Sequence, residues 1–379
     1  MIKRWLCILL VAAFLCAFPM AACSDPAETT PPDGDTEIPA LPEEEQPEYI
    51  DGREVLSAET VNAFDGEGVR LFGRTYINAN NLVLENAATG AEVSFYGTSL
   101  SADIISASST MYCRVFVDGD TEGTRLRITR NNTYTLAENL QEGIHTVRIV
   151  KATSSQNGNV KIDSFSTDGK FLRPEQADNL RIEFVGDSIT VGAGVFADSA
   201  QGCNADNSDA TKGFAYLTAQ ALGADCSIVA TEGICVGGKS ALSVNMLEMY
   251  ESISSISLGK YPAETPYDIV VVGLGTNDNW YMMGNAEYTV DRFAEDYQSL
   301  LGLIRGRNPD AVIVCVYGMM GVSQNIVTGI TQAIENMGDS RIFSCQLPTN
   351  LQGADSHPSA EGAIEQSAVL TEYLQELIA

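Results

Sequence analysis

Residues 180–190 read LRIEFVGDSIT, and this stretch decides the fold of the chain. An apolar run that ends at Val185 is followed at once by Gly186, Asp187 and Ser188, so a buried strand gives way to a polar turn. Serine becomes a useful nucleophile only when a base takes its proton, and imidazole suits that task near neutral pH. The stretch therefore predicts a strand with a candidate nucleophile at its carboxyl end.

The base can be sought among very few residues, because the chain contains only two histidines. His145 lies in the alternating run 143–150, which is typical of the surface of a strand. His357 lies in the sequence GADSHP at 353–358, close to the C-terminus. His357 is the candidate base.

Outward from this stretch, strands alternate with helices from residue 172 to residue 379. Further strands are expected at 225–230, 267–272 and 311–317, and two of the four are apolar enough to be buried on both faces. Helical spacing of apolar residues predicts a crossover helix before the last of these strands (Phe293, Tyr297, Leu300, Leu301, Ile304) and a terminal helix from near Ser359 (Ile364, Ala368, Leu370, Leu374, Leu377). The pattern indicates an α/β domain with a parallel sheet.

Each polar motif of this region falls at the end of a strand or the start of a helix. Ser188 follows the first strand, Gly233 the second and the run 275–278 (GTND) the third, while His357 precedes the last helix. Active sites in parallel sheets lie beyond the carboxyl ends of the strands. These residues are therefore expected to gather at one site.

Residues 49–171 predict a separate all-β domain. Short alternating stretches recur with Gly or Asn turns between them, as at 91–96, 112–119, 125–128 and 145–150, and Asp118-Gly119 marks a tight hairpin. Strands with one apolar face must bury it against a second sheet, so a β-sandwich is expected.

The N-terminus has the features of an export signal. Residues 1–22 combine Lys3 and Arg4 with a short apolar core, and Cys23 follows where a bacterial lipoprotein is cleaved and lipidated, with an ordinary Ala-x-Ala cleavage site as the alternative. Residues 24–48 contain nine acids, six prolines and no Lys or Arg. Such a segment cannot bury a core, so residues 23–48 are expected to form a tether outside the cell.

Composition excludes several classes of partner. A formal net charge of −28 with no cationic patch argues against nucleic acid, and contact with a membrane is expected only through the lipid at Cys23. The cysteines show no CxxC pair, so neither a zinc site nor a disulfide framework is expected, although Cys203 and Cys235 could pair. Cys226 and Cys315 are expected in the core. No metal or cofactor is expected, and the chain is expected to be a monomer.

Together, the Gly186-Asp187-Ser188 turn, Gly233, the 275–278 run and His357-Pro358 resemble the four sequence blocks of the SGNH, or GDSL-type, hydrolase superfamily over residues 178–379. The resemblance implies a three-layer hydrolase domain in which Ser188 attacks an ester carbonyl. It also implies that the Ser188 N–H, the Gly233 N–H and the Asn277 amide form the oxyanion hole. Gly237 and Gly238 are alternatives to Gly233.

One position departs from the superfamily pattern. The aspartate usually found three residues before the histidine is replaced by Ala354, and Asp355 lies two residues before it. We expect Asp355 to orient the imidazole as the third catalytic residue, with a backbone carbonyl as the alternative. The second choice would leave a dyad of Ser188 and His357.

The arrangement Gly-x-Asp-x-His-Pro after a jelly-roll-like β-sandwich is similar to carbohydrate esterase family 2. That resemblance implies an exported serine esterase that removes O-acetyl groups from polysaccharides of xylan or glucomannan type. Trp280 and Tyr281 are candidates for stacking on a sugar ring. The loops at 193–213 are rich in Asn, Asp, Ser and Ala, which favours small acyl groups. A lipase or thioesterase and a non-catalytic glycan-binding lipoprotein are the alternatives.

Overall fold

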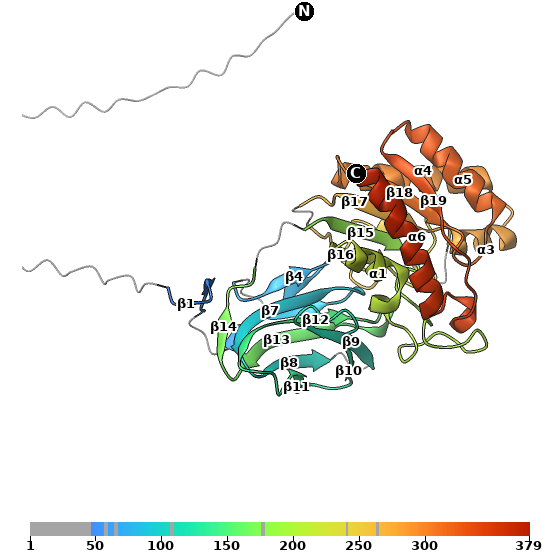
Figure 1. Cartoon of the computed structure of the whole chain (residues 1–379). Coiled ribbons are helices and arrows are strands. Elements are labelled where there is room, and N and C mark those ends of the chain that lie inside the picture. The colour runs from blue at the N-terminus through green and yellow to red at the C-terminus, as the bar shows by residue number, and fades with distance from the viewer. Residues whose placement is uncertain are drawn as a thin grey trace, which may run out of the picture. The chain divides into compact units, whose positions relative to one another are not determined.

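A computed structural model describes residues 47–56, 60–63, 67–106, 110–175, 179–239, 242–262 and 265–379. The expected signal peptide, Cys23 and nearly all of the expected tether lie outside these residues. Within them, an antiparallel β-sandwich is followed by a parallel sheet with helices (Figure 1). No helix of the described residues is both long enough and apolar enough to cross a membrane.

The sandwich consists of two six-stranded antiparallel sheets, as the sequence predicted. One sheet has the order β10-β9-β12-β7-β14 with β4 beside β7: β4 (Arg70–Phe72), β7 (Gly90–Gly97), β9 (Met111–Val117), β10 (Thr124–Ile128), β12 (Gly143–Lys151) and β14 (Lys170–Leu172). The other has the order β11-β8-β13-β6-β5 with β3 beside β13: β3 (Thr60–Asn62), β5 (Tyr76–Asn78), β6 (Asn81–Leu84), β8 (Leu100–Ser106), β11 (Asn132–Ala137) and β13 (Val160–Thr167). A separate two-stranded ribbon, β1 (Tyr49–Ile50) and β2 (Arg53–Glu54), precedes them.

Alternating side chains of both sheets meet in one core, in which Phe95, Val147 and Phe165 are almost fully buried. The turn predicted at Asp118-Gly119 is present, and both residues have positive φ, 50° and 78°. The two strands pair again only from Thr124, opposite Val115, so the connection is longer than a two-residue hairpin.

The second domain has a five-stranded sheet in the order β16-β15-β17-β18-β19, and every pair is parallel. Its strands are β15 (Arg181–Gly186), β16 (Asp225–Ala230), β17 (Ile269–Gly273), β18 (Val312–Tyr317) and β19 (Ile342–Gln346). The first four agree with the prediction to within two residues, whereas β19 was not predicted. Strand β15 lies between β16 and β17, so the chain winds outward from it in both directions.

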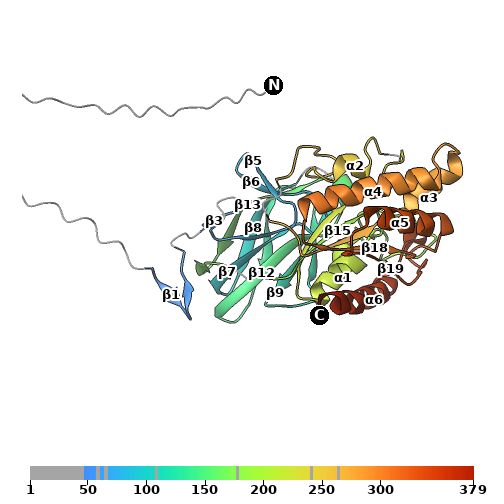
Figure 2. The ribbon, with the colours of Figure 1, turned by 90° about the horizontal axis from the view of Figure 1, so that it is seen from above.

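Helices cover both faces of this sheet (Figure 2). Alternate residues of β15 explain the arrangement, because Phe184 packs with α1 and α6 on one face and Val185 packs with α2, α4 and α5 on the other. The helices are α1 (Phe214–Ala221), α2 (Met246–Met249), α3 (Thr276–Gly284), α4 (Val290–Arg307), α5 (Gln324–Met337) and α6 (Ala360–Ile378), with short 3₁₀ turns η1 (Ser155–Asn157), η2 (Ala210–Lys212) and η3 (Ala354–Ser356).

The predicted crossover helix is α4, and all five of its predicted core residues are buried. The predicted terminal helix is α6, with Ser359 as its N-cap, but the predicted buried face is partly wrong. Leu370 and Leu374 are buried, whereas Ile364 is 59% exposed. The face turned to the protein includes Gly362, Ala363, Gln366 and Ser367. Ser367 contacts Thr218 of α1, and a Cβ at Gly362 would lie 2.2 Å from the side chain of Asn350.

Candidate active site

The structure brings Ser188 and His357 into direct contact. The Ser188 hydroxyl lies 2.8 Å from Nε2 of His357, although 169 residues separate them in sequence. Ser188 follows the carboxyl end of β15, and the strand order reverses at this strand. Ligands of parallel sheets usually bind at that place. Glycine is required at position 186, since a Cβ there would lie 1.9 Å from Oγ1 of Thr190.

The second ring nitrogen fixes the tautomer of His357. Nδ1 lies 2.9 Å from the carbonyl oxygen of Ala354. A carbonyl oxygen only accepts hydrogen bonds, so Nδ1 carries the proton and Nε2 is free to accept one from Ser188. This arrangement suits a general base.

Asp355 does not orient the ring, and the prediction that it does is wrong. Its exposed carboxylate accepts the backbone N–H of Cys203 at 2.8 Å, and Nδ1 of His357 is occupied by the Ala354 carbonyl. The cause is local geometry, because Asp355 has a left-handed φ of 50° inside the turn η3. The alternative of an orienting backbone carbonyl agrees with the structure.

Burial and charge act in opposite directions on His357. Burial lowers the pKa of His357, while the hydrogen bond to Ala354 and the carboxylates of Asp355 and Glu232 act to raise it, with a net decrease. A lowered pKa keeps the imidazole neutral, and therefore basic, near neutral pH.

The Asn277 amide is fixed beside the turn that contains Gly233. Its Nδ2 donates to the carbonyl oxygen of Ile234 at 3.0 Å and lies 3.3 Å from the carboxylate of Asp187. Gly233 has a left-handed φ of 75°, which glycine adopts without strain. Among the described residues, no acceptor receives the backbone N–H of Gly233 or of Ser188.

Two buried carboxyl groups support this region. Asp187 also accepts the N–H of Ile189, and burial raises its pKa to about 7. Asp278 accepts the N–H of Val236 and the hydroxyl of Tyr288, and burial raises its pKa to about 6. These contacts join the loops after β15, β16 and β17.

A cavity of about 500 Å³ opens beside Ser188, Asn277 and His357. Trp280 lines it and is 66% exposed, so its indole is available to a ligand. Tyr281 is not among the residues that line it, and its role in stacking on a sugar stays a prediction. Successive residues of a helix point about 100° apart, and the Tyr281 ring packs against that of Tyr288 at 5.1 Å between centroids.

One wall of this cavity is apolar. Leu274, Val316, Met319, Met320, Ile326 and Leu351 contribute to it. The polar loops at 193–213, from which small acyl groups were predicted, do not line it. Those loops lie instead on the Nδ1 side of His357, where Sγ of Cys203 is 3.5 Å from Nδ1. The polarity of the loops therefore carries no information about the acyl group.

The cysteines of the described residues are all free. Cys203 and Cys235 do not pair, and Cys226 and Cys315 are buried in the core as predicted. Burial raises the pKa of Cys203 to about 12, so its sulfur is a neutral thiol.

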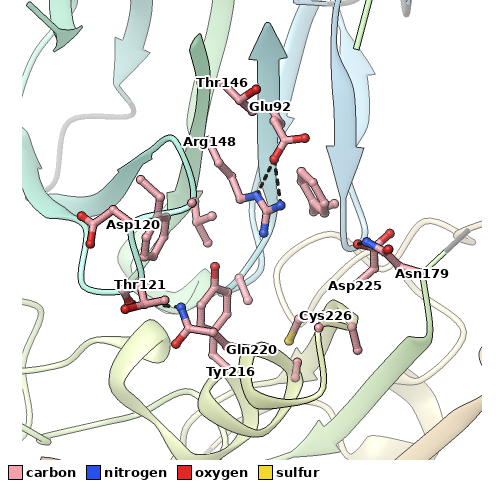
Figure 3. A pocket seen from close by; sticks show the side chains of 18 residues that line it. Glu92, Asp120, Thr121, Thr146, Arg148, Asn179, Tyr216, Gln220, Asp225 and Cys226 are labelled. Carbon is pink, nitrogen blue, oxygen red and sulfur yellow. Dashed lines mark hydrogen bonds and ion pairs between the residues drawn. The ribbon is translucent and has the colours of Figure 1, made fainter. Parts of the chain in front are cut away.

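Another cavity, of about 230 Å³, lies between the sandwich and α1, near the amino end of β16 (Figure 3). Arg148 and Glu92 form an ion pair of 2.8 Å on its wall, and Gln220 donates to the carbonyl oxygen of Thr121. It contains neither Ser188 nor His357. The catalytic candidates therefore belong to the cavity of about 500 Å³.

Sequence reasoning missed the residues that the sandwich brings to the site. Ser154 and Gln156 both donate to Glu232, the residue before Gly233. Nothing in the local sequence marks them, because they lie in a polar loop more than seventy residues earlier in the chain. The apolar wall at 316–320 was missed because the end of a buried strand was interpreted as core alone.

Comparisons with known proteins agree with this architecture. Residues 71–175 match the family model described as carbohydrate esterase 2 N-terminal, and residues 184–341 match that of the GDSL-like lipase/acylhydrolase family. Ser188, Gly233 and Asn277 lie inside the second match, whereas His357 follows it.

Two curated relatives and one solved structure illustrate the similarity. The chain is 27% identical to the cellulase/esterase CelE of Acetivibrio thermocellus over 320 residues, covering 78% of this chain but only 38% of the relative. It is 21% identical to an acetylxylan esterase / glucomannan deacetylase of Cellvibrio japonicus, covering 85% of this chain and 92% of the relative. A family two carbohydrate esterase from Clostridium thermocellum, solved with cellohexaose, superposes with a TM-score of 0.75 at 24% identity, covering 82% of this chain and 99% of that one.

Proposed function

Because the chain is a GDSL-type hydrolase that carries the N-terminal domain of carbohydrate esterase family 2, we propose that it is a serine esterase that removes O-acetyl groups from polysaccharides. The observation that carries the proposal is the 2.8 Å contact from the Ser188 hydroxyl to Nε2 of His357, whose Nδ1 is held by Ala354. The names of the Cellvibrio relative support acetylated xylan or glucomannan as the substrate class.

In the proposed mechanism, Ser188 Oγ attacks the acetyl carbonyl carbon while Nε2 of His357 takes the hydroxyl proton. The carbonyl oxygen becomes an oxyanion, which accepts hydrogen bonds from the N–H groups of Ser188 and Gly233. It also accepts one from Asn277 Nδ2, whose N–H then turns to it from the 3.3 Å contact with Asp187. Each such donor typically contributes about 100- to 1000-fold in rate. The imidazolium then protonates the departing sugar oxygen, and acetyl-Ser188 remains.

Deacylation repeats these steps with water. His357 takes a proton from a water molecule that attacks acetyl-Ser188, the same donors stabilise the second oxyanion, and the proton returns to Ser188 as acetate leaves. The imidazolium that forms twice is stabilised by the Ala354 carbonyl and by the charges of Asp355 and Glu232. A buried aspartate is therefore not needed behind the ring.

The cavity offers surfaces for both parts of an acetylated sugar. Trp280 presents an exposed indole face, and aromatic faces suit the C–H surfaces of pyranose rings. The leaving oxygen must lie near Nε2, so the sugar approaches from the side of His357. We place the acyl group against the apolar part of the lining, which includes Met319 and Met320.

We also propose, from the sequence alone, that the enzyme is exported and anchored to the bacterial surface through a lipid on Cys23. A polymer too large to enter a cell would then meet the enzyme outside it. Radiolabelled palmitate should enter the wild-type protein and not Cys23→Ala, and equal labelling of both would contradict the anchor.

The function is tested by acetate release from acetylated xylan, acetylated glucomannan and 4-nitrophenyl acetate. Ser188→Ala and His357→Ala should each lower kcat by several orders of magnitude, because a nucleophile and its base act as one unit. For the same reason the double variant should be no worse than either single one. Wild-type activity in Ser188→Ala would disprove the esterase mechanism, and a folded wild-type protein that binds these polymers without releasing acetate would support a glycan-binding role.

A further inference from the structure

The β-sandwich contacts the loop that contains Gly233 through a short segment, residues 153–157. This segment follows β12 and includes the turn η1. The fully buried ammonium of Lys151, the last residue of β12, donates to the carbonyl oxygens of Thr153 and Ser154 at 2.6 and 2.7 Å. The backbone N–H of Ala210 donates to the carbonyl of Ala152 at 2.8 Å. Contacts from both domains therefore fix the N-terminal end of the segment.

Two side chains of the segment contact the loop after β16, and a third contacts the loop after α2. Gln156 Nε2 donates to the carbonyl oxygen of Glu232 at 2.8 Å and to Oγ1 of Thr231 at 3.1 Å. Ser154 Oγ donates to the Glu232 carboxylate at 2.7 Å. Ser155 Oγ lies 3.0 Å from Oγ of Ser255, a residue of the hydrolase domain. Both the main chain and the side chain of Glu232 are thus fixed from the sandwich.

The contact of Gln156 has a direct geometric consequence. The carbonyl of Glu232 and the N–H of Gly233 belong to one peptide unit, which is planar and trans, so they point in opposite directions. Holding the carbonyl from one side fixes the direction of the N–H on the other. A hydrogen bond to the carbonyl also polarises the amide and strengthens its N–H as a donor.

Glycine at position 233 makes such support necessary. Gly233 has a φ of 75° and no side chain, and apart from its chain neighbours no atom lies within 4 Å of the position a Cβ would occupy, so no packing at that position restrains the glycine. Its N–H has no acceptor among the described residues. An unsupported peptide unit at a glycine can rotate, and a misdirected N–H cannot stabilise an oxyanion.

We propose that Gln156 is a positioning residue of the oxyanion hole, supplied by the sandwich domain, and that it fixes the Gly233 N–H through the Glu232 carbonyl. This inference rests on the proposed function, in which Gly233 donates to the oxyanion. The sandwich is then part of the catalytic apparatus, although it contributes no residue that touches the reacting atoms.

The test uses Gln156→Met, which keeps the length of the side chain and removes the donor, together with Gln156→Ala. Because Gln156 is exposed, both variants should fold and unfold as the wild type does. With 4-nitrophenyl acetate we expect kcat to fall by about 10- to 100-fold, less than the loss of a whole donor. KM should stay within about twofold, because the support acts on the oxyanion rather than on the bound ester.

The matched control is Gln220→Met. Gln220 also joins the two domains by a side-chain amide, donating to the carbonyl of Thr121 at 3.1 Å, but it lies at the other cavity (Figure 3). Its kcat should equal that of the wild type. An equal loss in Gln220→Met would mean that any domain contact matters and would overturn the assignment of Gln156.

Two reference variants separate the inference from the function on which it rests. If Ser188→Ala is inactive and Asn277→Ala is impaired while both Gln156 variants keep the wild-type kcat, the positioning role is wrong and the esterase mechanism stands. A raised KM with unchanged kcat would place Gln156 in substrate binding and would also overturn the inference. If Ser188→Ala retains full activity, the proposed function itself is wrong.

Discussion

At the scale of single residues, the structure replaces a carboxylate with a peptide carbonyl as the orienting group of His357. The Ala354 carbonyl carries only a partial charge, so it stabilises the imidazolium less than a buried aspartate would. The nearby carboxylates of Asp355 and Glu232 supply charge at longer range and raise the pKa of His357 against the effect of burial. Orientation and charge stabilisation are therefore divided between different residues.

Asp355→Asn tests this division. Asparagine keeps an oxygen that can accept the N–H of Cys203, so the turn should persist. We expect kcat on 4-nitrophenyl acetate, which carries no sugar, to fall by less than about tenfold, or about 1.4 kcal/mol. A loss of several orders of magnitude on this substrate, as when the orienting acid of a triad is removed, would show that Asp355 holds the ring.

Glu232→Gln tests the second charge. Its carboxylate raises the pKa of His357, so removal of the charge should lower that pKa. The ascending limb of the kcat/KM profile should then move to lower pH, because the base stays unprotonated in more acidic solution. Glutamine can still accept from Ser154, and Glu335→Gln on the exposed face of α5 is the control for loss of a charge. An unmoved limb in Glu232→Gln would contradict the electrostatic role.

At the scale of elements, apolar runs made four of the five parallel strands predictable. β19 was missed because Ile342–Gln346 is a half-exposed edge strand that contains Ser344 and Gln346, so its pattern is not that of a buried strand. The face of α6 was misassigned for a related reason, since Gly362, Ala363 and Ser367 are buried for their size rather than their hydrophobicity. Ser188, Asn277 and His357 could be predicted from their places at strand and helix ends. The contacts of Gln156 could not, because they depend on how two domains meet.

The connection after β18 predicts how acyl length should affect activity. Met319 and Met320 line the apolar side of the cavity, where the proposed geometry places the acyl group. We expect acetyl esters to be preferred, and Met319→Ala to improve the ratio of butyryl to acetyl activity, since each buried methylene contributes about 0.8 kcal/mol, or about fourfold. The measurement is kcat/KM for 4-nitrophenyl acetate, butyrate and octanoate, with exposed Met283→Ala as the control. A wild-type preference for octanoate would instead support a lipase.

At the scale of the whole molecule, the sandwich and the hydrolase domain share buried polar contacts as well as apolar core. Arg74, between β4 and β5, is 1% exposed. It donates to the carbonyl oxygens of Tyr250 and Ser252 at 2.5 and 2.7 Å and to the carboxylate of Glu183 in β15 at 3.0 Å. Phe116 and Val150 of the sandwich pack with Phe214 in one core. Such an interface predicts that the two domains unfold together.

Arg74→Ala should destabilise this interface between the two domains. The substitution leaves the carboxylate of Glu183, itself 1% exposed, without its cationic partner, and breaking a buried ion pair in this way costs about 3 to 5 kcal/mol. Urea unfolding of residues 23–379 measures the loss by two signals. Trp280 is the one tryptophan after residue 22, so its fluorescence reports the hydrolase domain, while circular dichroism reports both domains. The two signals should coincide in the wild type. Lys170→Ala removes an exposed ion pair with Glu48 and should cost less than about 1 kcal/mol. Separate transitions in the wild type, or an Arg74→Ala variant as stable as Lys170→Ala, would mean that the domains fold independently. The sandwich could then not hold Glu232 as rigidly as the positioning of the Gly233 N–H requires.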